Sequence, residues 1–80
     1  MTGRFVGETS MGFIHGKVYD LRSSIEPIHF RPGYGGRPEE DKICIVLRDK
    51  HSKAWCPYGS LEAVLRNWEF NLIHTEYNHI

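Results

Sequence analysis

The sequence predicts a mainly β domain of about five short strands, with one short helix before the last strand. Three observations carry this prediction. Short runs of β-branched and aromatic residues alternate with polar ones, glycines and prolines interrupt those runs, and a helical repeat of apolar residues occurs at a single place. The 80 residues, 40% of them hydrophobic and 25% charged, have the composition of one soluble globular domain.

The first two strands are predicted at residues 3–7 and 13–24. The first has the sequence GRFVG and is followed by a turn-prone stretch, ETSMG. In the second, Val18, Tyr19 and Leu21 supply β-branched, aromatic and aliphatic strand residues.

Residues 25–41 are predicted to form a long loop. Three prolines and three glycines fall within these 17 residues, IEPIHFRPGYGGRPEED. Proline lacks an N–H donor and glycine weakens regular structure, so a helix or a central strand is not expected here.

The third strand, residues 42–49, alternates two apolar faces, with Ile43, Ile45 and Leu47 on one and Cys44, Val46 and Arg48 on the other. Residues 54–58 return antiparallel as the fourth strand.

The register of this hairpin decides which residues face the core. If Lys50 and His51 centre the turn, Ile45 pairs with Cys56, and Cys56 lies on the inner face. A shift of one residue puts Trp55 there instead, and the sequence leaves both registers open.

The helix is predicted to begin after Ser60, a good N-cap residue. Apolar residues then recur at helical spacing: Leu61, Val64, Leu65 and Trp68. Residues 68–72 alternate apolar and polar as the last strand, and residues 75–80 are expected to fray.

Five short strands with a single helix before the last suggest that residues 1–80 form one small, strongly bent antiparallel barrel, because closing a short sheet protects its edges. An SH3-like β-barrel is the first choice of fold. An OB-like barrel is the alternative.

Two stretches, GKVYDL and WCPYGSLEAVLRNWEF, resemble those of short uncharacterised proteins of bacteriophages and prophages. The resemblance covers about a quarter to a third of the chain. It implies a compact accessory protein of a mobile element that works inside a bacterial host, and it transfers no active site.

Charge and cysteine content narrow the function classes. Ten Lys and Arg residues balance ten Asp and Glu residues, which removes the simplest argument for a nucleic-acid or anionic-membrane binder. The N-terminal residues do not resemble a signal peptide, and no apolar stretch is as long as a membrane-spanning segment. Two cysteines are too few for a disulfide framework, so we expect reduced thiols and a cytoplasmic location.

The cysteines raise three alternatives to a structural role. A nucleophilic Cys56 would need a base that the sequence does not place near it. In the register centred on Lys50 and His51, a Cys44–Cys56 disulfide would join residues on opposite faces of the hairpin, and an intracellular location disfavours the bond. A zinc site built from Cys44, Cys56, His74 and His79 lacks the close cysteine spacing of structural sites. We therefore predict Cys56 as a core residue and no metal or cofactor. The other histidines are predicted to be ordinary surface groups: His15, His29 and His51.

The long loop is the candidate binding site. It interleaves Phe30 and Tyr34 with Arg31 and Arg37, residue types that are enriched at binding hot spots. These aromatics could instead fold back onto the barrel. They could also stack on bases, although the acidic residues 39–41 next to them would repel a phosphate backbone and could face a basic partner.

The sequence contains no phosphate-binding loop, zinc-protease motif or nucleophile elbow. The predicted function is therefore a non-enzymatic module that binds a host or phage protein, for example a defence or nucleic-acid-processing enzyme. Direct nucleic-acid binding and a self-associating structural component are the alternatives.

Overall fold

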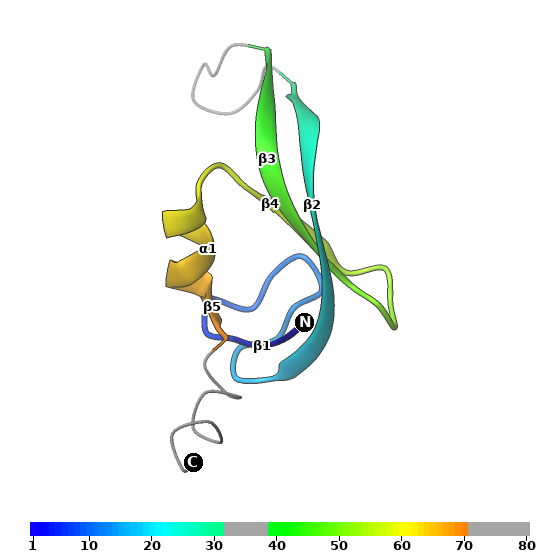
Figure 1. Cartoon of the computed structure of the whole chain (residues 1–80), viewed down its shortest axis with the longest axis vertical. Helices are drawn as coiled ribbons and strands as arrows, with labels where there is room; N and C mark the ends of the chain where they lie inside the picture. Colours follow the sequence, from blue (N-terminus) through cyan, green and yellow to red (C-terminus); the bar gives the residue numbers. More distant parts are fainter. Residues whose placement is uncertain (32–38, 71–80) are drawn as a thin grey trace, which may run out of the picture.

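The computed structural model describes residues 1–31 and 39–70. They form a five-stranded antiparallel sheet with one short helix before the last strand, and the strand order is β4-β3-β2-β1-β5 (Figure 1). The elements in chain order are β1 (Thr2–Phe5), β2 (Val18–Phe30), β3 (Glu40–Asp49), β4 (Trp55–Tyr58), α1 (Leu61–Asn67) and β5 (Trp68–Glu69). Among these residues no helix is both long and apolar enough to cross a membrane.

The predicted long loop is largely strand. β2 and β3 pair continuously from Leu21 with Asp49 to Phe30 with Glu40, so the prediction of a loop over 25–41 was wrong at both ends. The prediction failed because it treated Pro27 as incompatible with a strand. Proline is excluded only where its nitrogen faces a hydrogen-bonded neighbour.

The backbone polarity of β2 explains why Pro27 is accommodated. The N–H and C=O of Leu21 both bond to Met1, on the side of β1, whereas the C=O of Asp20 accepts from Lys50 at the end of β3. These directions alternate along an antiparallel strand. The backbone N–H and C=O groups of odd-numbered residues of β2 therefore point away from β3. Pro27 therefore removes no hydrogen bond from the β2–β3 pair.

The β3–β4 hairpin has a longer turn than expected. Ile45 pairs with Tyr58 and Leu47 with Cys56, which differs by two residues from the register centred on Lys50 and His51. A shift of two residues leaves every side chain on the same face. Cys56 accordingly lies on the inner face, packed against the core as predicted.

Aromatic residues build the core. Phe5, Phe13, Tyr19 and Trp68 are all buried, and Trp68 lies 4.9 Å from Phe13 and 5.1 Å from Phe5 between ring centroids. The indole N–H of Trp68 donates to the Tyr58 hydroxyl over 2.7 Å, which satisfies a polar group in this apolar surrounding.

The helix begins where the sequence predicts. The Ser60 side chain accepts a hydrogen bond from the Ala63 N–H as the N-cap. The predicted apolar face is only partly right, because Val64 is buried but Leu61 and Leu65 are exposed. With only seven residues, α1 turns a narrow face toward the core.

The sheet is not closed into a barrel, so that part of the fold prediction was wrong. β4 and β5 lie at opposite ends of the strand order, and no pairing joins them among the described residues. The predicted strand at residues 13–24 begins only at Val18, since a long connection precedes it, and β5 has two residues. Phe70, predicted as part of the last strand, lies after the end of β5 and stacks on Trp68. Residues 71 and 72 of that predicted strand and the 75–80 tail lie outside the described residues.

Candidate functional site

The far part of the β2–β3 hairpin extends away from the rest of the protein (Figure 1). β1 pairs with β2 only as far as Asp20, and β4 pairs with β3 only from Arg48 to Ile45. Beyond these points Glu26–Phe30 and Glu40–Cys44 pair only with each other among the described residues. We call this two-stranded segment, together with Ile25 at its root, the arm, and the remaining described residues the base.

The arm continues the face of the sheet that is buried in the base. In the base this core face carries Leu47, which is 2% exposed. Ile25 at the root of the arm and Ile43 within it lie on the same face, but they are 68% and 66% exposed. Pro27, directly opposite Ile43, is also exposed. The core face therefore runs out of the base as an apolar surface open to solvent.

The outer face of the arm carries the first of the predicted site residues. Phe30 ends β2, and the Lys42 ammonium lies 5.9 Å from its ring centroid. Lys42 also lies 3.4 Å from the carboxylate of Glu40. Arg31 follows directly and is exposed. The structure thus brings Phe30 and Arg31 together at the end of the arm.

The other two predicted site residues, Tyr34 and Arg37, lie outside the described residues.

An ion pair joins the arm to the base. Arg48 binds both carboxylate oxygens of Glu26 and donates to the Ser24 hydroxyl over 3.3 Å. The hydrogen bond from Arg48, with a second from Ser24, lowers the pKa of Glu26, and the pair raises that of Arg48. In the register of the sheet Arg48 reaches past Val46, which is fully buried although it lies on the outer face.

The same arginine takes part in a row of side chains across the outer face of the base. Arg22 pairs with Arg48, and Arg48 pairs with Trp55. The guanidinium carbon of Arg48 lies 5.5 Å from the indole centroid of Trp55, which is 37% exposed. Like charges directly opposite each other destabilise a strand pair, and Glu26 offsets one of them.

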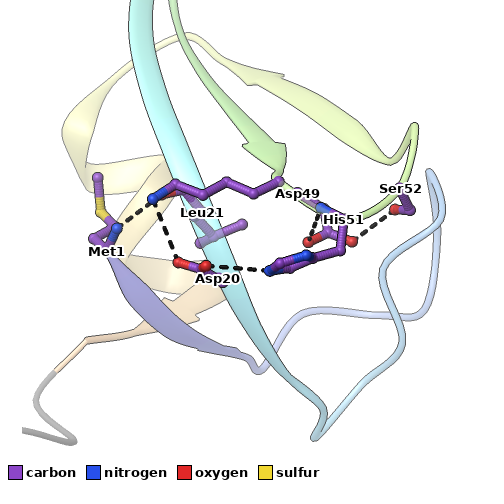
Figure 2. Close-up of polar contacts among 7 residues, drawn as sticks. Met1, Asp20, Leu21, Asp49, His51 and Ser52 are labelled. Atoms are coloured by element: carbon purple, nitrogen blue, oxygen red, sulfur yellow. Dashed lines mark hydrogen bonds and ion pairs between the residues drawn. The ribbon is translucent and has the colours of Figure 1, made fainter.

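A polar network fastens the other end of the β2–β3 hairpin (Figure 2). The His51 imidazole lies 3.2 Å from Asp20 and the Lys50 ammonium 3.6 Å from it. The hydrogen bond with His51 lowers the pKa of the Asp20 carboxyl. Ser52 donates to Asp49 over 2.7 Å. These contacts fix the β3–β4 turn against β2, so we assign them a structural role.

The three histidines outside the C-terminal segment are exposed, as predicted. On the arm, His29 lies 2.6 Å from Asp41 and 3.7 Å from Glu39. Within residues 1–31 and 39–70 no cluster of three potential ligands could hold a metal ion.

The two cysteines are free. Cys44 lies on the outer face of the sheet and Cys56 on the inner face, which prevents a disulfide between them or shared metal ligation. Burial raises the pKa of the Cys56 thiol, whereas a nucleophilic cysteine needs a lowered one. Of the proposed zinc ligands, His74 and His79 lie outside the described residues.

Sequence reasoning missed Ile25 and Ile43 as surface residues. Ile25 was assigned to a loop, and Ile43 was assigned to a face expected to be buried. Apolar and polar residues alternate on each side of Pro27 in SIEPIHF, with the apolar residues changing face at the proline, and this alternation was the available signal for a strand.

Comparisons with protein-family models, with curated proteins and with solved structures gave no match.

Proposed function

We propose that this protein is a non-enzymatic binding module that uses the arm to cover a surface of a protein partner. The single observation that carries the proposal is the pair Ile25 and Ile43, each about two-thirds exposed on one face of the hairpin. Contiguous exposed apolar surface on a small soluble domain is typical of interaction sites. Phe30 and Arg31 at the end of the arm are residue types enriched in such interfaces.

The resemblance to short phage and prophage proteins supports a partner in the cytoplasm of a bacterial host, such as a defence or nucleic-acid-processing enzyme. The first four strands lie next to each other in the sheet in chain order, and a helix precedes the fifth. Both features support an SH3-like arrangement with an open sheet. The raised pKa of Cys56 argues against this thiol as a nucleophile.

The test is capture from a nuclease-treated bacterial host lysate with the tagged full chain. We compare it with the Ile25→Thr/Ile43→Thr variant, in which threonine keeps the β-branched shape and loses the apolar surface. Val18→Thr, at a 43% exposed position of the base, is the matched control. Partner recovery should fall about tenfold or more in the arm variant and stay unchanged in the control. Equal recovery from all three proteins would remove the arm from the proposal.

A second candidate, nucleic-acid binding, has support of its own in the row formed by Arg22, Arg48 and Trp55. An exposed indole beside the Arg48 guanidinium, with Arg22 on the next strand, can stack a base and contact phosphates. Under this alternative, recovered material is lost on nuclease treatment, and Trp55→Ala abolishes recovery while the arm variant does not. Affinity would also fall steeply with added salt.

A further inference from the structure

The two edges of the hairpin arm differ in their capacity to accept another strand. The backbone N–H and C=O groups of odd-numbered residues of β2 point away from β3, so Pro27 removes a hydrogen-bond donor from the free β2 edge. Proline at such a position is one way in which proteins prevent unwanted strand pairing. The β2 edge of the arm is therefore guarded.

The β3 edge has no such guard among the described residues. The N–H of Asp49 donates to the C=O of Ala54, on the β4 side. Because hydrogen-bonding directions alternate along a strand, the N–H and C=O groups of the other odd-numbered residues of β3 point to the same side. β4 ends at Tyr58, opposite Ile45, and the chain then leads away to α1 (Figure 1). Asp41 and Ile43 consequently direct their N–H and C=O groups to a side where no described strand pairs with them.

We propose that this edge, from Asp41 to Ile43, binds an extended peptide segment of the partner, with basic and apolar residues, by strand addition. The added strand would pair with β3 just beyond the point where β4 ends. The inference rests on the proposed function and specifies how the arm would engage its partner. Strand addition supplies backbone hydrogen bonds, and alternate side chains supply specificity. An apolar side chain of the added strand would cover Ile43, which is 66% exposed.

Charge determines which occupant fits. Glu39, Glu40 and Asp41 place three carboxylates beside this edge. Lys42 lies 3.4 Å from Glu40, and the His29 imidazole lies beside Glu39 and Asp41. A basic segment is attracted there, whereas an acidic segment is repelled. The same charges oppose pairing of two arms from separate copies, since each would bring its own carboxylates. We therefore commit to a basic peptide and not to a second copy of this chain.

The probe is a blocked pentapeptide of alternating lysine and valine, titrated into the isotopically labelled full chain and followed by backbone amide NMR. We expect shift changes centred on the amides of Asp41 and Ile43, together with slower hydrogen exchange at both. A pentapeptide of alternating glutamate and valine should bind at least tenfold more weakly. Shifts confined to other parts of the protein, or equal binding of the acidic peptide, would overturn the proposal.

Two controls separate backbone pairing from simple apolar contact. A peptide whose valine nitrogens are methylated cannot donate to the edge, and it should bind about tenfold more weakly for each hydrogen bond lost. Ile43→Pro removes the outward N–H of the protein, as Pro27 does on β2, and leaves the β2–β3 hydrogen bonds in place. The methylated peptide keeps the test decisive even if this variant does not fold, because it leaves the protein unaltered.

The failure of this inference can be distinguished from failure of the proposed function. If Ile25→Thr/Ile43→Thr reduces partner capture but Ile43→Pro and peptide methylation change nothing, the partner docks on the face of the arm and not at its edge. If the threonine variant captures the partner as well as the wild type does, the arm is not the binding surface.

Discussion

The base and the arm share the β2 and β3 strands, yet they are stabilised in different ways. In the base the core face is covered by Val64 of α1 and by the aromatic cluster around Trp68. In the arm the same face exposes Ile25 and Ile43. A two-stranded hairpin alone is marginally stable, so the arm depends on its attachment to the base through Arg48 and Glu26. The base therefore contains the packed core, whereas the apolar face of the arm is left uncovered.

The largest effect is expected in the base, at Trp68. This side chain is 2% exposed and contacts Phe5, Phe13 and Tyr19. Trp68→Ala should cost about 3–5 kcal/mol, which is comparable to the whole stability of so small a domain. Urea unfolding followed by circular dichroism should show a mostly unfolded chain. A cooperative transition close to that of the wild type would contradict the assignment of the core.

A smaller effect is expected where the β1–β2 connection meets the β3–β4 turn. Gly12 has φ +88°, and an added Cβ would lie 2.7 Å from the Cβ of Ala54. Gly12→Ala should destabilise the protein by about 1–3 kcal/mol through backbone strain and this contact. Gly16 has φ +86° with open space around it, so Gly16→Ala isolates the strain. Denaturation midpoints should fall further for Gly12→Ala, and equal midpoints would show that the contact is relieved.

The attachment of the arm should respond to acid. The pKa of Glu26 is lowered below its ordinary value of 4.5 by Arg48 and Ser24. The contribution of this ion pair is therefore complete above about pH 4.5, and it is lost as pH falls through the lowered pKa. Arm amides should exchange faster relative to base amides as pH falls below 4.5. In Glu26→Gln this arm-specific change should disappear, and its persistence would place the acid sensitivity elsewhere.

The smallest stability change is expected at the exposed isoleucines. Ile25→Thr and Ile43→Thr should each shift the free energy of unfolding by no more than about 0.5 kcal/mol, because both side chains are about two-thirds exposed. The same changes should weaken partner capture, which separates binding from folding. If either variant unfolds at a markedly lower urea concentration, that isoleucine contributes to the fold.

The base was more predictable from sequence than the arm. The N-cap at Ser60 and the inward Trp68 follow from local patterns that tertiary structure did not override, whereas the inner position of Cys56 depended on a hairpin register that the sequence left open. The exposure of Leu61 and Leu65 was not predictable, because it depends on how far the sheet extends over a seven-residue helix. The prediction of a closed barrel was wrong for a related reason. Local patterns specify strands, but they do not determine whether the two edge strands of the sheet pair with each other.

For the candidate site, the sequence singled out residues 25–41 for their composition but misjudged their structure. Phe30 and Arg31 lie at the end of the arm, within the segment chosen for its aromatic and arginine content. The strand on each side of them was hidden by Pro27, whose compatibility depends on which way its nitrogen faces. That direction is a property of the pairing with β3 and β1, and a single strand does not reveal it.

The most direct test of the account is hydrogen exchange measured by mass spectrometry on the full chain, with and without the captured partner. We predict protection in the arm and the residues that adjoin its end, at 25–31 and 39–44, with no change at Arg22, Arg48 and Trp55 or along α1. If only Arg22, Arg48 and Trp55 or the helix were protected from exchange, while the arm exchanged as in the free protein, the claim that the arm is the binding surface would be contradicted.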